Sequence, residues 1–258
     1  MKAAALGLLP DLPARLWLVR HGQSAGNVAA ARATEAGQAL IEIADRDVDV
    51  PLSELGTRQA TALGRWFARQ PPHERPTLVL SSPYARAAQT ARLVATAAGL
   101  ELPPERLLID ERLRERELGM LNRLTKHGIT ARYPEQAELR ARLGKFYYRP
   151  PSGESWCDVI LRLRSVTDFL NLRCRDERVL IVAHQVIVLC FRYLLEGMTE
   201  ATLLEIDAQA EVANCSVTAY AREADQQPMQ LRLYNFVAPL EEGGAPVTHE
   251  SDAPAAAR

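Results

Sequence analysis

The sequence is short of three features that would each assign it to a class of protein. Its 258 residues include four cysteines, which are widely spaced and form no C-x-x-C pair. This spacing argues against a zinc knuckle and a dense disulfide framework, and it fits a reducing compartment. No apolar run approaches the roughly 20 residues that a membrane span requires. The first residues lack the apolar core of a secretory signal, so we expect a cytoplasmic protein with no membrane partner.

Neither sign of charge is in excess, because 31 lysines and arginines accompany 32 aspartates and glutamates. A net charge of −1 gives no reason to expect nucleic acid as a partner. The composition, 47% hydrophobic and 24% charged, is that of an ordinary globular protein. Any attraction for an anionic ligand must therefore be local.

Strand and helix patterns alternate along the chain. The expected strands cover residues 15–20, 77–81, 107–109, 178–183, 216–220 and 231–236. The expected helices cover residues 22–33, 54–69 with Ser53 as N-cap, 83–98, 154–172 and 186–195. This alternation predicts an α/β fold with a mostly parallel sheet and helices on both faces. We expect one domain over residues 14–237, and composition predicts a disordered tail over 238–258.

Two of the expected strands end on a histidine. The segment 18–24 reads LVRHGQS and contains Arg20 and His21, whereas the segment 179–185 reads VLIVAHQ and ends with His184-Gln185. In open α/β sheets, ligands bind beyond the carboxyl ends of the strands. Arg86 opens a helix after another strand and is placed at the same edge. Because arginine donors match the charged oxygens of a phosphoryl group, the sequence predicts one phosphate site assembled from distant segments.

These residues also suggest different catalytic roles. His21 is the candidate nucleophile, because nearby arginines and a helix N-terminus disfavour the imidazolium and keep a ring lone pair available. His184 would bind the phosphoryl oxygens and stabilise their charge. A general acid must protonate the leaving alkoxide, and Glu115 and Glu117 both qualify. No H-x-H or H-E-x-x-H spacing favours the alternative of a metal site, so we expect no metal or cofactor.

Taken in chain order, these motifs resemble the histidine phosphatase superfamily. The resemblance is carried by LVRHGQS (18–24) with Asn27, PLSELG (51–56), SSP (81–83) with Arg86 and QT (89–90), RER (114–116), GES (153–155) and AHQ (183–185). It spans about residues 16–220. It implies a phosphoglycerate mutase-like fold, a three-layer α/β/α sandwich with a mostly parallel mixed sheet and a short helical cap at about 119–153.

The resemblance implies a catalytic role for five residues. His21 would be the residue that is phosphorylated, with Arg20, Arg86 and His184 around the phosphoryl group. Glu115 falls where the family places its proton donor, which favours it over Glu117.

Further positions would bind the substrate. Asn27 and Gly22 match residues beside the phosphate, and Gln23 stands where many members carry glutamate. Gln185 resembles the bisphosphatase branch, because mutases usually have His-Gly-Asn at this point. Arg140 and Lys145 lie about where fructose-2,6-bisphosphatases hold the sugar phosphate, whereas Leu189 replaces a further arginine of those enzymes.

The pattern is most similar to the fructose-2,6-bisphosphatase and broad-specificity phosphatase branches. It predicts a metal-independent phosphatase that hydrolyses a small phosphorylated metabolite, a sugar phosphate or similar phosphomonoester, through a phosphohistidine. Three alternatives remain: phosphoglycerate mutase-type phosphotransfer, a silent module that binds phosphorylated ligands, and a protein-phosphohistidine phosphatase. The expected partner is a small phosphorylated substrate, and the chain would be a monomer or a homodimer.

Overall fold

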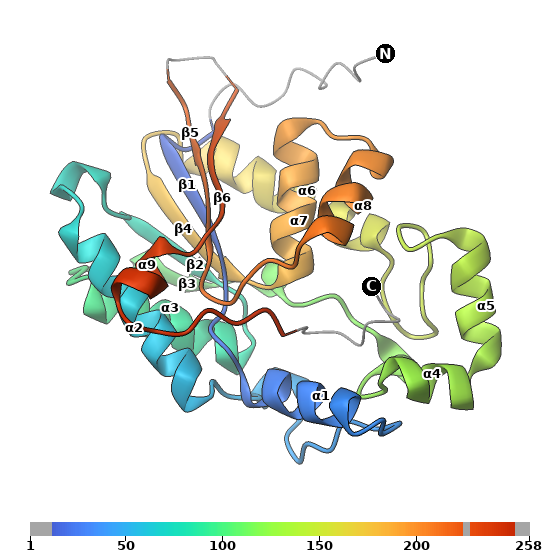
Figure 1. Cartoon of the computed structure of the whole chain (residues 1–258). Helices are drawn as coiled ribbons and strands as arrows, with labels where there is room; N and C mark the ends of the chain where they lie inside the picture. Colours follow the sequence, from blue (N-terminus) through green and yellow to red (C-terminus); the bar gives the residue numbers. More distant parts are fainter. Residues whose placement is uncertain (1–11, 224–227, 251–258) are drawn as a thin grey trace.

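The computed structural model describes residues 12–223 and 228–250 (Figure 1). Its strands are β1 (Arg15–Arg20), β2 (Leu78–Ser81), β3 (Leu107–Ile109), β4 (Arg178–Ala183), β5 (Val217–Ala221) and β6 (Gln230–Phe236). Its α-helices are α1 (Ala25–Glu35), α2 (Glu54–Arg69), α3 (Ala85–Ala97), α4 (Lys126–Arg132), α5 (Pro134–Leu143), α6 (Trp156–Arg173), α7 (Gln185–Glu196), α8 (Glu200–Gln209) and α9 (Ala238–Glu242). In this part of the chain, no helix is long and apolar enough to cross a membrane.

The strands form one mixed sheet in the order β3-β2-β4-β1-β5-β6. The first four strands of this order run parallel, and β5 and β6 are antiparallel additions at one side. In the parallel pair of β1 with β4, Arg20 lies opposite Ala183. The residues that follow these two strands, His21 and His184, therefore leave the sheet side by side.

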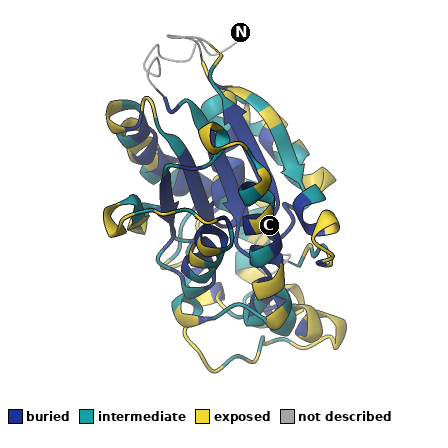
Figure 2. Cartoon of the chain, turned by 90° about the vertical axis from the view of Figure 1, so that its left-hand side faces the viewer, coloured by how far each residue is buried: buried dark blue, intermediate teal, exposed yellow. Residues whose placement is uncertain are grey.

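Successive residues of the central strands enter two different cores, because side chains alternate between the faces of a sheet. Leu16 and Leu18 of β1 pack with α6, α7 and α8, whereas Trp17 and Val19 pack with α2, α3 and α9. Figure 2 shows these strands as the most buried layer of the molecule. Two covered faces explain the nearly continuous apolar runs of β1 and β4. The predicted three-layer α/β/α architecture is confirmed.

The cap, at about residues 119–153, is helical, as the resemblance implied. Helices α4 and α5 lie on one side of the molecule (Figure 1). A separate apolar cluster of Leu121, Leu124, Ile129 and Tyr148 holds the cap together. A short antiparallel bridge between Leu40 and Leu124 connects it to residues 34–49, which sequence patterns did not assign to an element.

The structure differs from the disordered tail expected over 238–258. Residues 238–242 form α9, and Leu240 and Ala245 are buried in the same core as α2. Buried Pro239, Leu240 and Ala245 help to dock the segment, which composition averaged over the whole tail does not reveal. The rest of the expected tail, 251–258, lies outside the described residues.

Two glycines allow the loop after β1 to approach α2 closely. A Cβ at Gly22 would lie 2.6 Å from the Gly56 carbonyl oxygen, and one at Gly56 would lie 2.0 Å from the Gln23 carbonyl oxygen. Backbone atoms cannot give way as a side chain would, so glycine is needed at both positions. This contact fixes the loop that carries the first histidine.

Candidate active site

Four segments that are distant in sequence bring their chemical groups together at the carboxyl edge of the sheet. His21 follows β1, His184 is the N-cap of α7 after β4, and Arg86 is the second residue of α3 after β2. The rings of His21 and His184 meet edge to face with centroids 5.1 Å apart. Glu115 Oε2 lies 3.7 Å from His184 Nδ1. All four residues are at least 95% buried.

The His21 backbone is fixed on both sides. Its N–H donates to the Ala183 carbonyl at 2.9 Å, and its carbonyl accepts from the Asn214 side chain at 3.0 Å. Its Nδ1 lies 2.7 Å from the Gly22 carbonyl oxygen. Because a carbonyl can only accept, Nδ1 carries the ring proton. In the neutral ring, Nε2 therefore holds the lone pair needed for nucleophilic attack.

Arg20 and Asn27 direct their donors to one point. Arg20 is fully buried, and one of its terminal nitrogens donates to the Val212 carbonyl at 2.7 Å. Asn27 Oδ1 accepts from Ser24 N at 2.9 Å in a capping box at the start of α1. This cap uses the amide oxygen, so the amide NH₂ is the group turned toward Arg20. Both donors contact the carbonyl of Glu250.

Arg86 is held from two sides. Its guanidinium donates to the Asp47 carbonyl at 2.7 Å and pairs with the Asp47 carboxylate at 2.9 Å. The same group lies over the Tyr84 ring, 4.8 Å from its centroid. Burial and then the charge of Asp47 raise the pKa of Tyr84, so it remains a neutral phenol. Asp47 lies in the segment that the sequence did not assign, which is why this ion pair was not predicted.

The second histidine is positioned by Ser82 and faces the acid. Ser82 Oγ lies 2.8 Å from His184 Nε2. On the other side, Glu115 Oε1 accepts from the Arg116 N–H at 2.7 Å, which leaves Oε2 as the oxygen facing His184. The resemblance implied Glu115 over Glu117. Glu115 is the carboxylate that faces His184, whereas Glu117 Oε1 accepts from Gly119 N.

Three other residues predicted to bind substrate, Gly22, Gln23 and Gln185, also border this edge. Gly22 N donates to Thr90 Oγ1 at 3.0 Å. Gln23 accepts from Ser53 Oγ at 2.7 Å and donates to the Glu250 carboxylate at 2.8 Å. Gln185 begins α7, is 5% exposed, and has an amide oxygen with no hydrogen-bond partner among the described residues.

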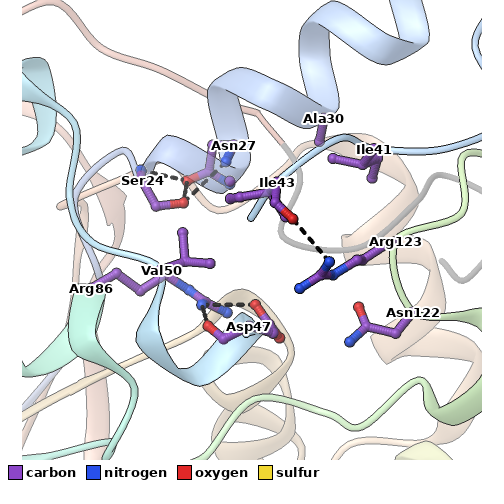
Figure 3. A pocket seen from close by; sticks show the side chains of 11 residues that line it. Ser24, Asn27, Ala30, Ile41, Ile43, Asp47, Val50, Arg86, Asn122 and Arg123 are labelled. Carbon is purple, nitrogen blue, oxygen red and sulfur yellow. Dashed lines mark hydrogen bonds and ion pairs between the residues drawn. The ribbon is translucent and has the colours of Figure 1, made fainter. Parts of the chain in front are cut away.

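A pocket adjoins Asn27 and Arg86, as Figure 3 shows. Ser24, Asn27 and Arg86 form one side of it. Its other walls combine apolar and polar side chains, namely Ile41, Ile43, Val50, Asp47, Asn122 and Arg123. Arg123 donates to the Ile43 carbonyl at 2.9 Å and so connects the cap to this wall. The pocket can accept a group attached to a phosphate held by Arg86 and Asn27.

The two predicted cap residues have different surroundings. Lys145 forms an ion pair with Asp207 of α8 and lies over the Trp156 ring, so its charge is neutralised away from the histidines. Arg140 lies close enough to Arg116 that burial, followed by the charge of Arg140, lowers the pKa of Arg116 to about 10. Arg140 therefore adds positive charge beside Arg116, whereas Lys145 is part of the packing between the cap and α8.

Glu154 holds the loop that carries the general acid candidate. Its carboxylate accepts from Arg114 at 2.7 Å, from Arg162 Nε at 3.0 Å and from the Glu117 N–H at 3.0 Å. Burial raises the pKa of Glu154, but the hydrogen bond and charge of Arg162 and the other donors outweigh it and leave the pKa below its ordinary value of 4.5. This carboxylate is thus the anchor of the Glu115 loop.

Fold and site together define a three-layer α/β protein with paired histidines and arginines at the carboxyl edge of its sheet. The sequence matches the "Histidine phosphatase superfamily (branch 1)" over residues 16–235. The chain belongs to this superfamily.

Its relatives are phosphatases and mutase-like proteins. A 6-phosphofructo-2-kinase/fructose-2,6-bisphosphatase of Caenorhabditis elegans is 37% identical over 223 residues, which cover 83% of this chain and 43% of the relative. A probable phosphoglycerate mutase GpmB of Yersinia pestis is 30% identical over 210 residues, which cover 79% of this chain and 83% of the relative. The chain spans less than half the length of the bifunctional relatives.

Solved structures similar to this chain also include a phosphatase. A mycobacterial glucosyl-3-phosphoglycerate phosphatase in complex with VO3 superposes with a TM-score of 0.62 at 27% identity, covering 86% of this chain and 99% of the other. Bacillus stearothermophilus YhfR superposes with a TM-score of 0.67 at 27% identity, covering 88% of this chain and 98% of the other. These relationships are consistent with a phosphoric monoester hydrolase.

Replacing Glu154 tests its role as an anchor. The folded-state pKa lies below the unfolded one, so the ionised carboxylate stabilises the fold above the unfolded pKa and loses this effect as pH falls through the folded pKa. We expect Glu154→Gln to lower the free energy of unfolding by about 1–3 kcal/mol at pH 7, and this difference to shrink in acid. Urea unfolding at several pH values measures it, with exposed Glu138→Gln as the control. Equal stabilities of the two variants at pH 7 would contradict the role.

Proposed function

We propose that the chain is a phosphatase that hydrolyses a small phosphomonoester through a phosphohistidine on His21. The observation that carries the proposal is the arrangement of His21, His184 and Glu115: a ring with its lone pair on Nε2, a second ring at 5.1 Å, and a carboxyl oxygen 3.7 Å beyond it. A nucleophile, an anion-binding group and a proton donor are the three parts that acid-assisted phosphoryl transfer requires.

In the first half-reaction, His21 Nε2 attacks phosphorus while the bond to the ester oxygen breaks. Arg20, Arg86 and Asn27 hold the phosphoryl oxygens, and His184 stabilises the charge that spreads over them. Glu115 gives its proton to the departing alkoxide. The products are a neutral alcohol, a Glu115 carboxylate and a phosphoryl group bonded to Nε2.

The second half-reaction reverses these roles. Glu115, now a carboxylate, takes a proton from a water molecule as the water oxygen attacks phosphorus. The bond from phosphorus to Nε2 breaks, which restores the His21 lone pair and releases inorganic phosphate. The buried arginines remain fixed throughout, so little reorganisation accompanies the movement of charge.

The surroundings support a small substrate with polar and apolar parts. The pocket beside Arg86 and Asn27 has an apolar wall of Ile41, Ile43 and Val50, while Arg123 supplies charge. The amide oxygen of Gln185 can accept from a sugar hydroxyl. The relatives' substrates, fructose 2,6-bisphosphate and glucosyl-3-phosphoglycerate, are phosphorylated sugars or sugar acids by name. We therefore propose a sugar phosphate or similar metabolite, acted on in the cytoplasm.

A mutase is the second candidate, because the Yersinia relative carries that name and is matched over most of its length. In a mutase, the phosphohistidine would pass its phosphoryl group to another hydroxyl rather than to water. Isomerisation of 3-phosphoglycerate without phosphate release would distinguish this activity from hydrolysis.

Single substitutions test the mechanism. We expect His21→Ala to lower kcat/KM by at least about a thousandfold, because the variant lacks the nucleophile that forms the intermediate. Glu115→Gln should lower kcat about 10²–10⁴-fold with alkyl phosphates, and much less with p-nitrophenyl phosphate, whose leaving group needs no proton. Phosphate release in chelator is the measurement, with Glu117→Gln as the matched control. Full activity of His21→Ala, or activity that requires added metal, would contradict the proposal.

A further inference from the structure

Ser82 is a fully buried serine that contacts the second histidine and that no motif role explains. Its Oγ lies 2.8 Å from His184 Nε2 and accepts from the Tyr84 N–H at 3.3 Å. Its backbone N–H donates to the Val182 carbonyl at 3.0 Å, which fixes the residue against β4. Both the position and the rotation of this hydroxyl are therefore constrained.

The hydroxyl proton needs an acceptor because the group is buried. Among the described residues, the recorded hydrogen bonds offer it one, His184 Nε2. If Nε2 accepts, the proton of the neutral ring resides on Nδ1, the nitrogen that faces Glu115. We propose that Ser82 is a positioning residue that fixes His184 as an Nδ1–H donor to the phosphoryl group. The assignment of the His184 tautomer does not depend on the proposed function. The effect of that tautomer on catalysis does rest on the proposed function.

The tautomer can be measured without substrate. In ¹⁵N NMR spectra of the full chain near pH 8, we expect the wild-type His184 to be protonated on Nδ1, and Ser82→Ala to populate the Nε2–H form as well.

We expect kcat to fall about tenfold in Ser82→Ala with little change in KM, and Ser82→Thr to recover most of the lost kcat. Ser81→Ala is the matched control, because its buried hydroxyl contacts only the Ser82 carbonyl among the recorded bonds.

An unchanged tautomer in Ser82→Ala, or an Nε2–H ring in the wild type, would overturn the assignment even if the enzyme proves to be a phosphatase. Loss of activity without a tautomer change would also overturn it, since a merely structural role predicts that result. If Ser82→Ala does not fold, the wild-type spectrum alone decides whether Nδ1 carries the proton.

The C-terminal segment 246–250 provides a second, independent observation. Gln59 of α2 donates to the Pro246 carbonyl at 2.8 Å and to Thr248 Oγ1 at 2.9 Å. Asn214 N donates to the Thr248 carbonyl at 3.0 Å, and Thr248 Oγ1 donates to Asn214 Oδ1 at 2.9 Å. Four hydrogen bonds thus attach the segment next to the loop that supports His21.

Beyond this attachment, Glu250 enters the phosphoryl site. Its carbonyl accepts from Arg20 and from Asn27, and its carboxylate accepts from Gln23 Nε2 at 2.8 Å. Two of the donors proposed for the phosphoryl oxygens are therefore occupied by the chain itself. We propose that segment 246–250 is an internal competitor that must leave before phosphate or a phosphorylated substrate binds.

Gln23 explains why an acidic residue can dock here. Its amide oxygen accepts from Ser53 Oγ, which directs its NH₂ toward Glu250. A glutamate at position 23 would place two carboxylates in contact, and like charges at this distance repel. Gln23 therefore recognises the Glu250 carboxylate, beside the residues that hold the rest of the segment.

Phosphate affinity tests this proposal directly. We expect a chain that stops after Val247 to bind inorganic phosphate about tenfold more tightly than the full chain, as measured by calorimetry. Thr248→Val, which removes the hydroxyl held by Gln59 and Asn214, should shift the affinity in the same direction by a smaller factor. His249→Ala changes an exposed side chain of the same segment and should have no effect.

A synthetic peptide of residues 246–258 should compete with phosphate for the shortened chain. Weaker phosphate binding by the shortened chain would show that the segment helps to form the site, and unchanged binding would show that it does not occupy the site in solution. Either result overturns the proposal. Because the measurement needs no turnover, it stands apart from the proposed hydrolysis.

Discussion

The structure depends on keeping two arginines buried at the carboxyl edge of the sheet. Arg20 is 0% exposed and Arg86 is 3% exposed. A guanidinium removed from water costs several kcal/mol unless hydrogen bonds compensate it. Carbonyls of Val212 and Asp47 supply part of this compensation, and the loop conformations that present them follow from it. The Val212 carbonyl carries no formal charge, so it satisfies an Arg20 donor while leaving a potential that favours a phosphate dianion. The Asp47 carboxylate, by contrast, offsets part of the charge of Arg86.

This constraint explains what could be predicted from the sequence. Strands at 15–20 and 178–183 were predicted with correct bounds, because a strand buried on both faces has a continuous apolar run that ends abruptly at a polar residue. The histidines follow those runs, so parallel pairing alone brings His21 and His184 together. Ser53 was predicted as the N-cap of α2 because its side-chain chemistry is local.

Other features depend on contacts between segments that carry no common pattern. Asp47 reaches Arg86 from an irregular loop, and Lys145 turns to Asp207 because α8, which sequence periodicity did not reveal, packs against the cap. Glu250 enters the site from a segment whose composition resembles a disordered tail. In each case long-range ion pairs or hydrogen bonds decide the outcome. A buried and cationic site attracts any acceptor within reach, including acceptors on its own chain.

The central claim is that the phosphoryl group passes through His21. The most direct measurement mixes the chain with a ³²P-labelled phosphomonoester, quenches the reaction in alkali within milliseconds, and locates the label by peptide mapping. We expect a base-stable, acid-labile phosphoryl group on the peptide that contains His21, forming before phosphate is released and absent from His21→Ala. Release of labelled phosphate with no protein-bound label at any time, from a wild-type chain and a His21→Ala chain alike, would contradict it.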